Sequence, residues 1–281
     1  MTDAALPILA GVMGWPVRQS KSPLIHTHWL NALGIDGAYV RFPVRPGLVE
    51  AALRGMSALG IVGMQATMPH KRACFEAVDQ LSDAARALGA VNTVTVQADG
   101  SLRGHNTDLA GFLEPLADVT LAGQAVTVLG AGGAAAALVV GLASKKPARI
   151  TIINRSRVGI DRLLSDSAGS LEGIEVRTGG WDQAQELIKD EALLANATSL
   201  GMVGQPPLPL DVGALPDGAL VYDIITHPHD TELLKAARRR GLTTFDGLQM
   251  LIGQAREGFA LFYGQAAPAS EDGALRSLLL A

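Results

Sequence analysis

The stretch AVTVLGAGGAAA, residues 125–136, decides the fold of this chain. A short β-branched run ends in glycines and continues into an alanine-rich run, which predicts a strand, a tight turn and a helix. Gly130, Gly132 and Ala135 fit the G-x-G-x-x-G/A pattern of a dinucleotide-binding βαβ unit. Glycine allows the sharp turn at 130 and the close approach of a pyrophosphate at 132, while a small residue at 135 lets the helix pack on the strand.

The start of the predicted helix offers backbone N–H groups and the positive end of the helix dipole to phosphate groups. The cofactor-binding residues expected at this turn are Gly130, Ala131, Gly132, Gly133 and Ala134. Because glycine-alanine turns also occur as plain structural turns, the surrounding sequence must support this interpretation.

The next predicted strand, residues 149–153, ends in Asn154, Arg155, Ser156 and Arg157. In NAD-binding units an acidic residue at this point bonds the ribose 2′-OH, but the first carboxylate here is Asp161. Arginines and a serine hydroxyl instead suit a 2′-phosphate, so the predicted cofactor is NADP. The alternative is that the two arginines are solvated loop charges.

Composition excludes several classes of protein. The 281 residues are 48% hydrophobic but only 4% aromatic, which suits close packing of helices on sheets in an α/β fold. A net charge of −4 argues against nucleic-acid binding through phosphate neutralisation. The single Cys74 excludes an internal disulfide and a cysteine-cluster metal site, and it favours a cytoplasmic location.

No membrane segment is expected. Residues 125–143 carry no charge, but their centre consists of glycines and weakly apolar alanines, which argues against a membrane span. The first residues, MTDAA, lack a basic n-region, so no signal peptide is expected there.

Strand and helix patterns alternate along the chain. In the first part they predict a mostly parallel sheet, with Ser22 as the N-cap of a helix and Pro23 at its first position. From residue 125 to 245 the spacing is that of a doubly wound sheet, with the domain crossing near 106–116. Strands are expected at 8–12, 38–44, 61–66, 92–96, 125–129, 148–153, 174–177, 193–196, 220–225 and 243–245. Helices are expected at 22–33, 47–59, within 71–88, and at 106–116, 158–166, 183–187, 231–240 and 246–263.

Polar clusters follow the predicted strands of the first part, where parallel sheets place their sites. They are SKS at 20–22, TMPHK at 67–71, GAVNT at 89–93 and GHNTD at 104–108. Together with GWPVRQSKSPLIH at 14–26, NATSLGM at 196–202 and DGLQMLIGQA at 246–255, they strongly resemble the shikimate dehydrogenase family, including its quinate dehydrogenase-like members. The resemblance extends from about residue 14 to residue 263.

The resemblance implies the roles of individual residues. Its substrate-binding residues would be Ser20, Ser22, Thr67, Asn92, Asp108 and Gln254. Ser20 and Ser22 would hold the substrate carboxylate, Asn92 and Asp108 would hold ring hydroxyls, and Lys71 would be the catalytic lysine paired with Asp108. In the cofactor half, Asn154, Arg155 and Ser156 match the family's NADP signature, and Thr198, Ser199 and Gly247 fall in its further motifs. The implied domains are a substrate-binding domain at 1–108, completed by helices at 247–281, and a Rossmann-type NADP domain at 109–246.

Elementary chemistry agrees with these roles. Oxidation of a secondary alcohol needs a hydride acceptor and a group that takes the hydroxyl proton, and a lysine can do the latter if its surroundings tune its pKa. A nearby carboxylate such as Asp108 would keep Lys71 oriented. The alternatives are a surface lysine at a helix start and a first-turn acid that stabilises the helix.

Three positions depart from the family pattern. Gln65 stands in place of the usual asparagine, Thr226 in place of a tyrosine, and Gln249 where a glycine is common. A phenolic ring is therefore missing at 226, so a shifted preference toward quinate, an aminoshikimate or another cyclic hydroxy acid is one hypothesis.

Other functions stay open at this point. The chain could be a catalytically weak ligand-binding or sensing protein, or another two-domain NADP enzyme such as a folate dehydrogenase. The histidine pairs at 26 and 28 and at 227 and 229 lack a nearby ligand cluster, so no metal is expected. The expected partner is a small cyclic hydroxy acid, and the expected assembly is a monomer or homodimer.

Overall fold

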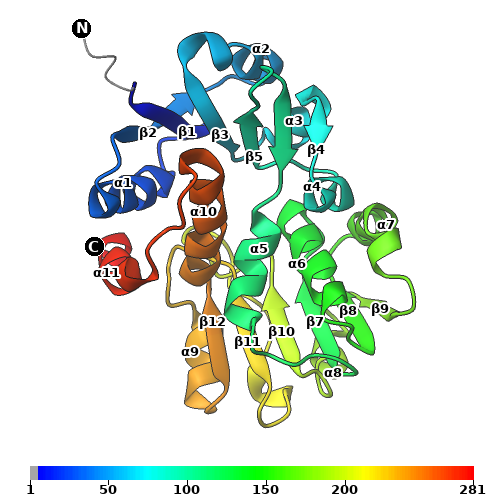
Figure 1. Cartoon of the computed structure of the whole chain (residues 1–281). Coiled ribbons are helices and arrows are strands. Elements are labelled where there is room, and N and C mark those ends of the chain that lie inside the picture. The colour runs from blue at the N-terminus through cyan, green and yellow to red at the C-terminus, as the bar shows by residue number, and fades with distance from the viewer. Residues whose placement is uncertain (1–5) are drawn as a thin grey trace, which may run out of the picture. The chain divides into compact units, whose positions relative to one another are not determined.

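The protein, described here by a computed structural model of residues 6–281, divides into two compact units (Figure 1). The first consists of Met1–Thr107 and Gln254–Ala281, and the second of Asp108–Gly253. The sequence MTDAA, for which no signal peptide is expected, lies outside the described residues. Each unit has its own six-stranded sheet, which confirms the predicted α/β class.

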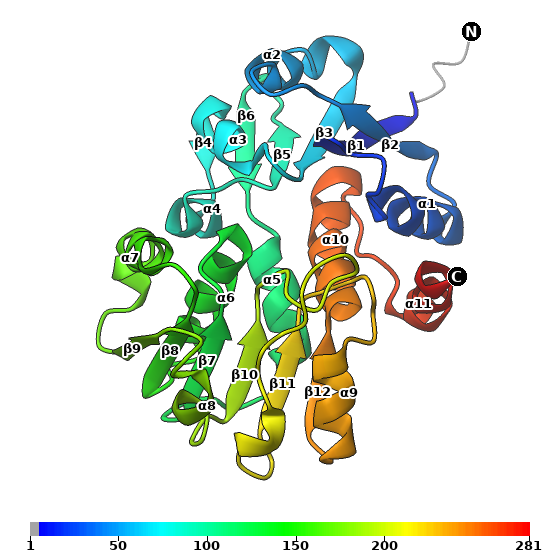
Figure 2. The ribbon, with the colours of Figure 1, turned by 180° about the vertical axis from the view of Figure 1, so that it is seen from behind.

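The sheet of the second unit is entirely parallel, with the strand order β12-β11-β10-β7-β8-β9 (Figure 2). Its strands are β7 (Ala125–Leu129), β8 (Arg149–Ile153), β9 (Glu175–Gly179), β10 (Leu193–Asn196), β11 (Leu220–Asp223) and β12 (Thr243–Asp246). Its helices are α5 (Asp108–Leu113), α6 (Gly133–Ser144), α7 (Arg157–Asp166), α8 (Ala184–Leu187), α9 (Glu232–Arg239) and the start of α10 (Gly247–Tyr263). Numbered from β7, this is the 3-2-1-4-5-6 order of a Rossmann fold.

Alternate residues of the central strands enter two separate cores in this unit. On β10, Leu193 and Ala195 pack with α5, α6 and α7, whereas Leu194 packs with α8 and α9. On β11, Tyr222 packs in the same core as Leu193, and Val221 packs in the same core as Leu194. Because side chains alternate across a strand, near-continuous apolar runs are what a sheet covered on both faces requires.

The sheet of the first unit is mixed, with the order β2-β1-β3-β5-β6-β4. Its strands are β1 (Ile8–Gly14), β2 (Gly37–Pro43), β3 (Ile61–Ala66), β4 (Gln80–Leu81), β5 (Thr93–Val96) and β6 (Leu102–His105). Its helices are α1 (Ser22–Leu33), α2 (Val49–Arg54), α3 (Lys71–Ala77), α4 (Asp83–Leu88), the rest of α10, and α11 (Asp272–Leu280). The pairs β1–β2, β1–β3 and β4–β6 are parallel, whereas β5 runs antiparallel to β3 and β6.

Two different cores support this sheet. Side chains of α2, α3 and α4, including Leu53 and Cys74, pack in an aliphatic core with β3 and β5. A second group, which we call the aromatic cluster, brings together rings from α1, β2 and α10. Its members are His26, Trp29, Tyr39, Phe259, Phe262 and Tyr263.

Three local predictions are wrong at helix ends. Ser22 is the first residue of α1 and not its N-cap, because the backbone at Lys21 is already near the helical region and makes Lys21 the cap. The helix expected at 47–59 ends at Arg54, and a 3₁₀ turn follows Gly55. The helix expected at 106–116 is an α-helix only over Asp108–Leu113, because Pro115 lacks the N–H that a further α-helical hydrogen bond needs. Residues Glu114–Leu116 form a 3₁₀ turn instead.

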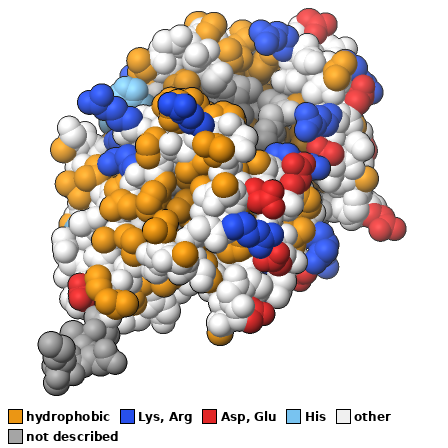
Figure 3. Space-filling view, turned by 90° about the horizontal axis from the view of Figure 1, so that it is seen from above, with side chains coloured by type: hydrophobic (Ala, Val, Ile, Leu, Met, Phe, Trp, Pro, Cys, Tyr) orange, Lys and Arg blue, Asp and Glu red, His pale blue; other side chains and the backbone are white. Residues whose placement is uncertain are grey.

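Over residues 6–281, no helix is both long enough and apolar enough to cross a bilayer. In Figure 3, side chains of both charge signs surround an area of apolar side chains on the face that is shown.

Candidate active site

The predicted glycine turn lies at the carboxyl end of β7, in the centre of the second sheet. Gly130 has φ +106°, which favours glycine, and a Cβ there would lie 3.0 Å from Thr198 Cγ2. Neighbours of β7 are β8 on one side and β10 on the other, so the chain leaves β7 at the point where the strand order reverses. Doubly wound sheets bind nucleotides at this switch point.

Gly132 and Gly133 differ from Gly130 in what a side chain would meet. A Cβ built on either of them meets open space among the described residues, and neither has a positive φ. Packing within the protein therefore does not require these glycines, whereas a phosphate lying on the turn would. Gly132 is the N-cap of α6, and Ala135 is fully buried in the core below. The turn thus fits the diphosphate of a dinucleotide.

The four residues after β8 open α7. Ser156 is its N-cap, and its Oγ accepts a hydrogen bond from the N–H of Gly159 at 3.3 Å. Arg157 is exposed and pairs with Asp161 at 2.9 Å, while its Nη1 donates to Thr178 Oγ1 at 3.2 Å. Asn154 and Arg155 complete the predicted group, and Arg155 is exposed. Two guanidinium groups thus lie where the fold places the adenosine ribose.

The loop after β10 is held by Asn196, which is fully buried. Its Oδ1 accepts from the N–H and hydroxyl of Thr198 at 3.0 and 2.7 Å, and its Nδ2 donates to Asp223 Oδ1 at 3.0 Å. Burial raises the pKa of Asp223, and hydrogen bonds from Thr231, Ile225 and Asn196 act in the opposite direction. Thr198 and the exposed Ser199 therefore stand on a fixed turn beside Gly130.

Gly247 has a packing explanation of its own. A Cβ at this position would lie 2.4 Å from the carbonyl oxygen of Ile224 and 2.5 Å from that of Ile225. Backbone packing therefore requires glycine here whether or not a ligand binds. Its predicted contact with the cofactor remains a prediction.

Four predicted substrate residues make hydrogen bonds in two groups within the first unit. Ser20 Oγ donates to Ser22 Oγ at 3.3 Å. Gln254 Oε1 accepts from Gln65 Nε2 at 3.0 Å and from Thr107 Oγ1 at 3.4 Å. Asn92 Nδ2 donates to Thr107 Oγ1 at 3.1 Å.

Tyr39 extends the group that contains Gln254 and Asn92. Its hydroxyl donates to Gln65 Oε1 at 2.5 Å. A hydrogen-bonded network therefore runs from Tyr39 through Gln65, Gln254 and Thr107 to Asn92, over β2, β3 and α10. Tyr39 and Thr107 were not predicted as site residues. Thr107 lies within the GHNTD motif, which is a signal that could have identified it, whereas nothing local marks Tyr39.

Thr67 and Lys71 lie in the segment that follows β3. The N–H of Thr67 donates to Met13 O at 2.9 Å, and the carbonyl of Lys71 accepts from Val91 N at 3.0 Å. These bonds tie the loop to β1 and to the residue before Asn92. Asp108 begins α5 and belongs to the second unit, so its pairing with Lys71 remains a prediction.

Two of the three departures have a local explanation. Gln249 Oε1 accepts from the N–H of Asp246 at 2.9 Å, and Asp246 Oδ1 accepts from the N–H of Gln249 at 3.1 Å. This is a capping box at the start of α10. Gln65 is 4% exposed and belongs to the network. Thr226 is half-buried in the loop after β11.

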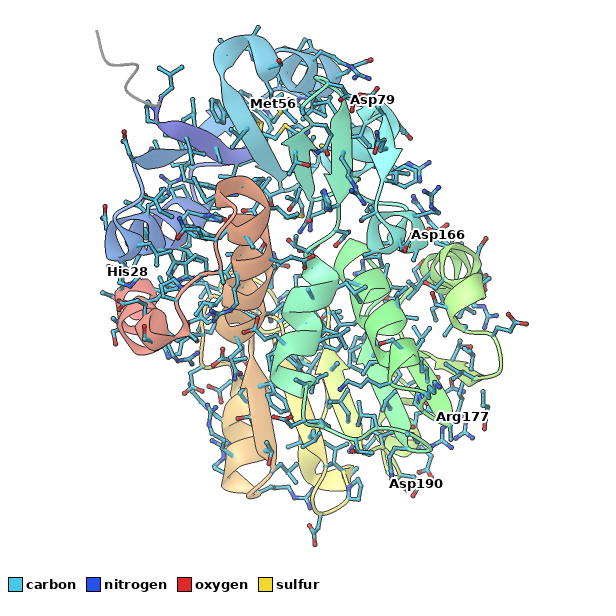
Figure 4. All side chains as sticks on the ribbon, in the orientation of Figure 1. His28, Met56, Asp79, Asp166, Arg177 and Asp190 are labelled. Atoms are coloured by element: carbon cyan, nitrogen blue, oxygen red, sulfur yellow. The ribbon has the colours of Figure 1, made fainter. Side chains whose placement is uncertain are left out.

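His26 and His28 both make contacts with other side chains. His26 stacks on Tyr39 with ring centroids 3.9 Å apart, and burial lowers its pKa to about 3. His28, labelled in Figure 4, pairs with Glu271 at 3.0 Å. Within residues 6–281, no three His, Cys, Asp or Glu side chains are grouped so that they could hold a metal ion.

A Rossmann unit with a phosphate-accepting glycine turn, linked to an α/β unit with a buried polar network, defines the class of two-domain nucleotide-dependent dehydrogenases. Comparison with known proteins makes this specific. The family model described as the shikimate dehydrogenase substrate binding domain matches residues 12–94. The chain is 47% identical over 273 residues to the shikimate dehydrogenase (NADP(+)) of Sphingopyxis alaskensis, covering 97% of both chains. The chain therefore belongs to the shikimate dehydrogenase family.

Solved structures of the family share the whole fold. The ligand-free 5-ketofructose reductase of Gluconobacter sp. strain CHM43 has a TM-score of 0.89 and 32% identity, covering 99% of both chains. The quinate dehydrogenase of Corynebacterium glutamicum in complex with NAD has a TM-score of 0.88 and 30% identity, covering 98% of this chain and 99% of that one. One fold thus carries several substrates and cofactors.

Proposed function

We propose that this protein is an NADP-dependent dehydrogenase that interconverts shikimate and 3-dehydroshikimate. The hydrogen bonds within the first unit carry the proposal, because they hold four predicted substrate residues, the Ser20–Ser22 pair and the group of Gln254 and Asn92, in that one unit. The name of the Sphingopyxis relative supports the same substrate and cofactor.

Each unit has a role in this proposal. Residues 1–108, completed by 247–281, bind the substrate, and residues 109–246 bind NADP. Gly130, Ala131, Gly132, Gly133 and Ala134 receive the diphosphate, with support from the open space at positions 132 and 133. Asn154, Arg155, Ser156 and Arg157 receive the 2′-phosphate, and Thr198, Ser199 and Gly247 border the cofactor.

In the reaction, Ser20 and Ser22 hold the substrate carboxylate, and Thr67, Asn92 and Gln254 bind further oxygen atoms. Lys71 takes the proton of the reacting hydroxyl as it becomes a carbonyl and returns it in reverse, while Asp108 orients the lysine. NADP, when bound, accepts or supplies the hydride. We further propose a cytoplasmic location, supported by the lone Cys74, and an assembly that is a monomer or a homodimer.

The decisive experiment follows NADPH absorbance with purified protein, shikimate and either NADP or NAD. Replacing Lys71 with alanine should lower kcat about a hundredfold or more, with a much smaller change in KM, because it removes the acid–base group. Lys235→Ala is the matched control, since Lys235 lies on α9 and pairs with Glu232 at 2.9 Å. No turnover by the unaltered protein, or full activity of Lys71→Ala, would refute the proposal.

A second candidate keeps the chemistry and changes the substrate. Thr226 replaces the family's tyrosine, and the 5-ketofructose reductase shares 32% identity with this chain. Quinate, an aminoshikimate and 5-ketofructose therefore belong in the same assay. A kcat/KM for any of them above that for shikimate would favour this candidate. Binding of shikimate without turnover would instead favour a sensing protein.

A further inference from the structure

Gln65, at the end of β3, joins two elements that are distant in sequence. Its Oε1 accepts from the hydroxyl of Tyr39 on β2, and its Nε2 donates to Oε1 of Gln254 on α10 at 3.0 Å. The side chain is 4% exposed, so both bonds lie away from solvent. A buried amide group that loses a hydrogen-bond partner has no water to replace it, which costs free energy. Both bonds therefore restrain the side chain of Gln65.

Tyr39 is a rigid anchor for Gln65. Its ring stacks on His26 with an interplanar angle of 7°, and it lies near Phe262 in the aromatic cluster. Burial raises the pKa of Tyr39 well above its usual value, so the phenol keeps its proton and remains a hydrogen-bond donor. With Tyr39 donating to Oε1 of Gln65, the Nε2 group of Gln65 faces Gln254.

Gly258 gives Gln65 the room it needs. A Cβ at position 258 would lie 2.7 Å from Gln65 Nε2. Gly258 lies in the interior of α10, where glycine is normally unfavourable relative to alanine. The side chain of Gln65 is one methylene longer than the asparagine usual in the family. The absence of a side chain at position 258 leaves space for this extra length.

The bonds to Gln254 fix the orientation of its amide. Oε1 of Gln254 accepts from both Gln65 and Thr107, on two sides of the substrate network. With Oε1 accepting from two side chains, Gln65 and Thr107 together fix the plane of the Gln254 amide. A fixed amide suits a residue that is predicted to bind a substrate oxygen.

We propose that Gln65, anchored by Tyr39 and accommodated by Gly258, is a positioning residue that orients Gln254 toward a substrate oxygen. This inference rests on the proposed function. Gln65 acts on the affinity for the hydroxy acid through Gln254, and it does not act on proton transfer or on the cofactor.

The test compares steady-state constants of variants that remove or shorten the amide. Gln65→Met keeps the length but loses both bonds, and it should raise KM for shikimate about tenfold, as expected for a lost buried hydrogen bond to a binding group. Because chemistry and cofactor binding are untouched, kcat and KM for NADP should stay within about twofold. Tyr39→Phe, which keeps the ring and loses the donor, should act in the same direction by a smaller factor. Gln97→Met is the control, since Gln97 donates to Thr95 elsewhere in the same unit.

Gly258 provides a second, independent comparison. Gly258→Ala should raise KM for shikimate in the unaltered background, because the methyl group displaces the Gln65 amide. In the Gln65→Asn background the same substitution should add little, because the shorter side chain withdraws from α10. A purely structural role predicts lower stability with equal effects in both backgrounds.

The outcomes separate the two proposals. Turnover of shikimate by the unaltered protein with an unchanged KM in Gln65→Met and Tyr39→Phe overturns the role of Gln65 alone. A fall in kcat without a rise in KM also overturns it. No turnover by the unaltered protein overturns the proposed function and this inference with it.

Discussion

At the scale of single residues, His26 makes the stability of the protein depend on pH. Burial lowers its pKa to about 3, whereas an unfolded histidine titrates at about 6.5. Between these values the unfolded chain binds more protons, so the free energy of unfolding falls as the pH falls through this window. His26→Phe keeps a ring against Tyr39 and removes the titration. We expect it to reduce the loss of unfolding free energy between pH 7.5 and pH 4.5 by about 2–3 kcal/mol.

Urea unfolding at the two pH values measures this effect. His229→Gln is the control, because His229 is exposed in the loop after β11. An equal acid loss in His26→Phe and in the unaltered protein would show that other groups cause the pH dependence.

Residue roles could be predicted from sequence only where a motif carries them. Ser20, Asn92 and Gln254 lie in recognisable motifs, and the structure brings Asn92 and Gln254 into one network through Thr107. Tyr39 could not be predicted, because its bond to Gln65 joins residues 26 positions apart and depends on how β2 and β3 flank β1. The role of Gly132 could be predicted, because the requirement for glycine there comes from a single turn of the chain and not from a distant contact.

At the scale of elements, the capping box makes Gln249 a determinant of the start of α10. Its side chain satisfies the N–H of Asp246 at 2.9 Å. Gln249→Ala should lower the free energy of unfolding by about 0.5–1 kcal/mol, because it leaves this N–H without its capping acceptor. Gln249→Glu keeps an acceptor at the same position and should change it much less. Equal losses in the two variants, measured by urea unfolding, would contradict the capping role.

Elements with strong periodicity were predicted well, and short ones were not. The strand and helix around residues 125–144 match β7 and α6, because their hydrophobic pattern changes abruptly from strand to helix. The two-residue β4 and the hairpin strand β6 were missed, because too few residues carry a pattern. Helix ends at Gly55 and Pro115 were also missed, although glycine and proline are the usual signals for them.

At the scale of the whole molecule, each unit has cores of its own, so we expect the cofactor to stabilise the second unit more than the first. Trp15 and Trp29 belong to the first unit and Trp181 to the second, and these are the three tryptophans of the chain. Tryptophan fluorescence of Trp181→Phe therefore reports on the first unit alone, whereas far-UV circular dichroism reports on both. Ligand at a hundred times its Kd adds about 2.7 kcal/mol to the state that binds it.

We expect NADP to raise the unfolding midpoint seen by circular dichroism more than the midpoint seen by fluorescence of Trp181→Phe. The unaltered protein, which keeps Trp181, is the control for the substitution. Coincident transitions that shift equally would show that the two units unfold together.

The two-unit organisation was only partly accessible from sequence. Alternating strands and helices predicted two sheets, but the return of the chain to the first unit after Gly253 came from the family resemblance alone. Spacing cannot reveal such a return, because the contacts of Gln254 are with residues far earlier in the chain. For the same reason the partnership of Lys71 and Asp108 rests on motif matching.

The close approach of Gln65 to Gly258 also constrains the order in which the two residues can change during evolution. A chain with a short side chain at 65 can lose its side chain at 258 first, and it pays only the modest helix penalty of glycine. The opposite order passes through an intermediate in which a Cβ lies 2.7 Å from the amide nitrogen. Historical paths to this pair should therefore begin in the helix, and a reversion at 258 alone would require the Gln65 amide to shift.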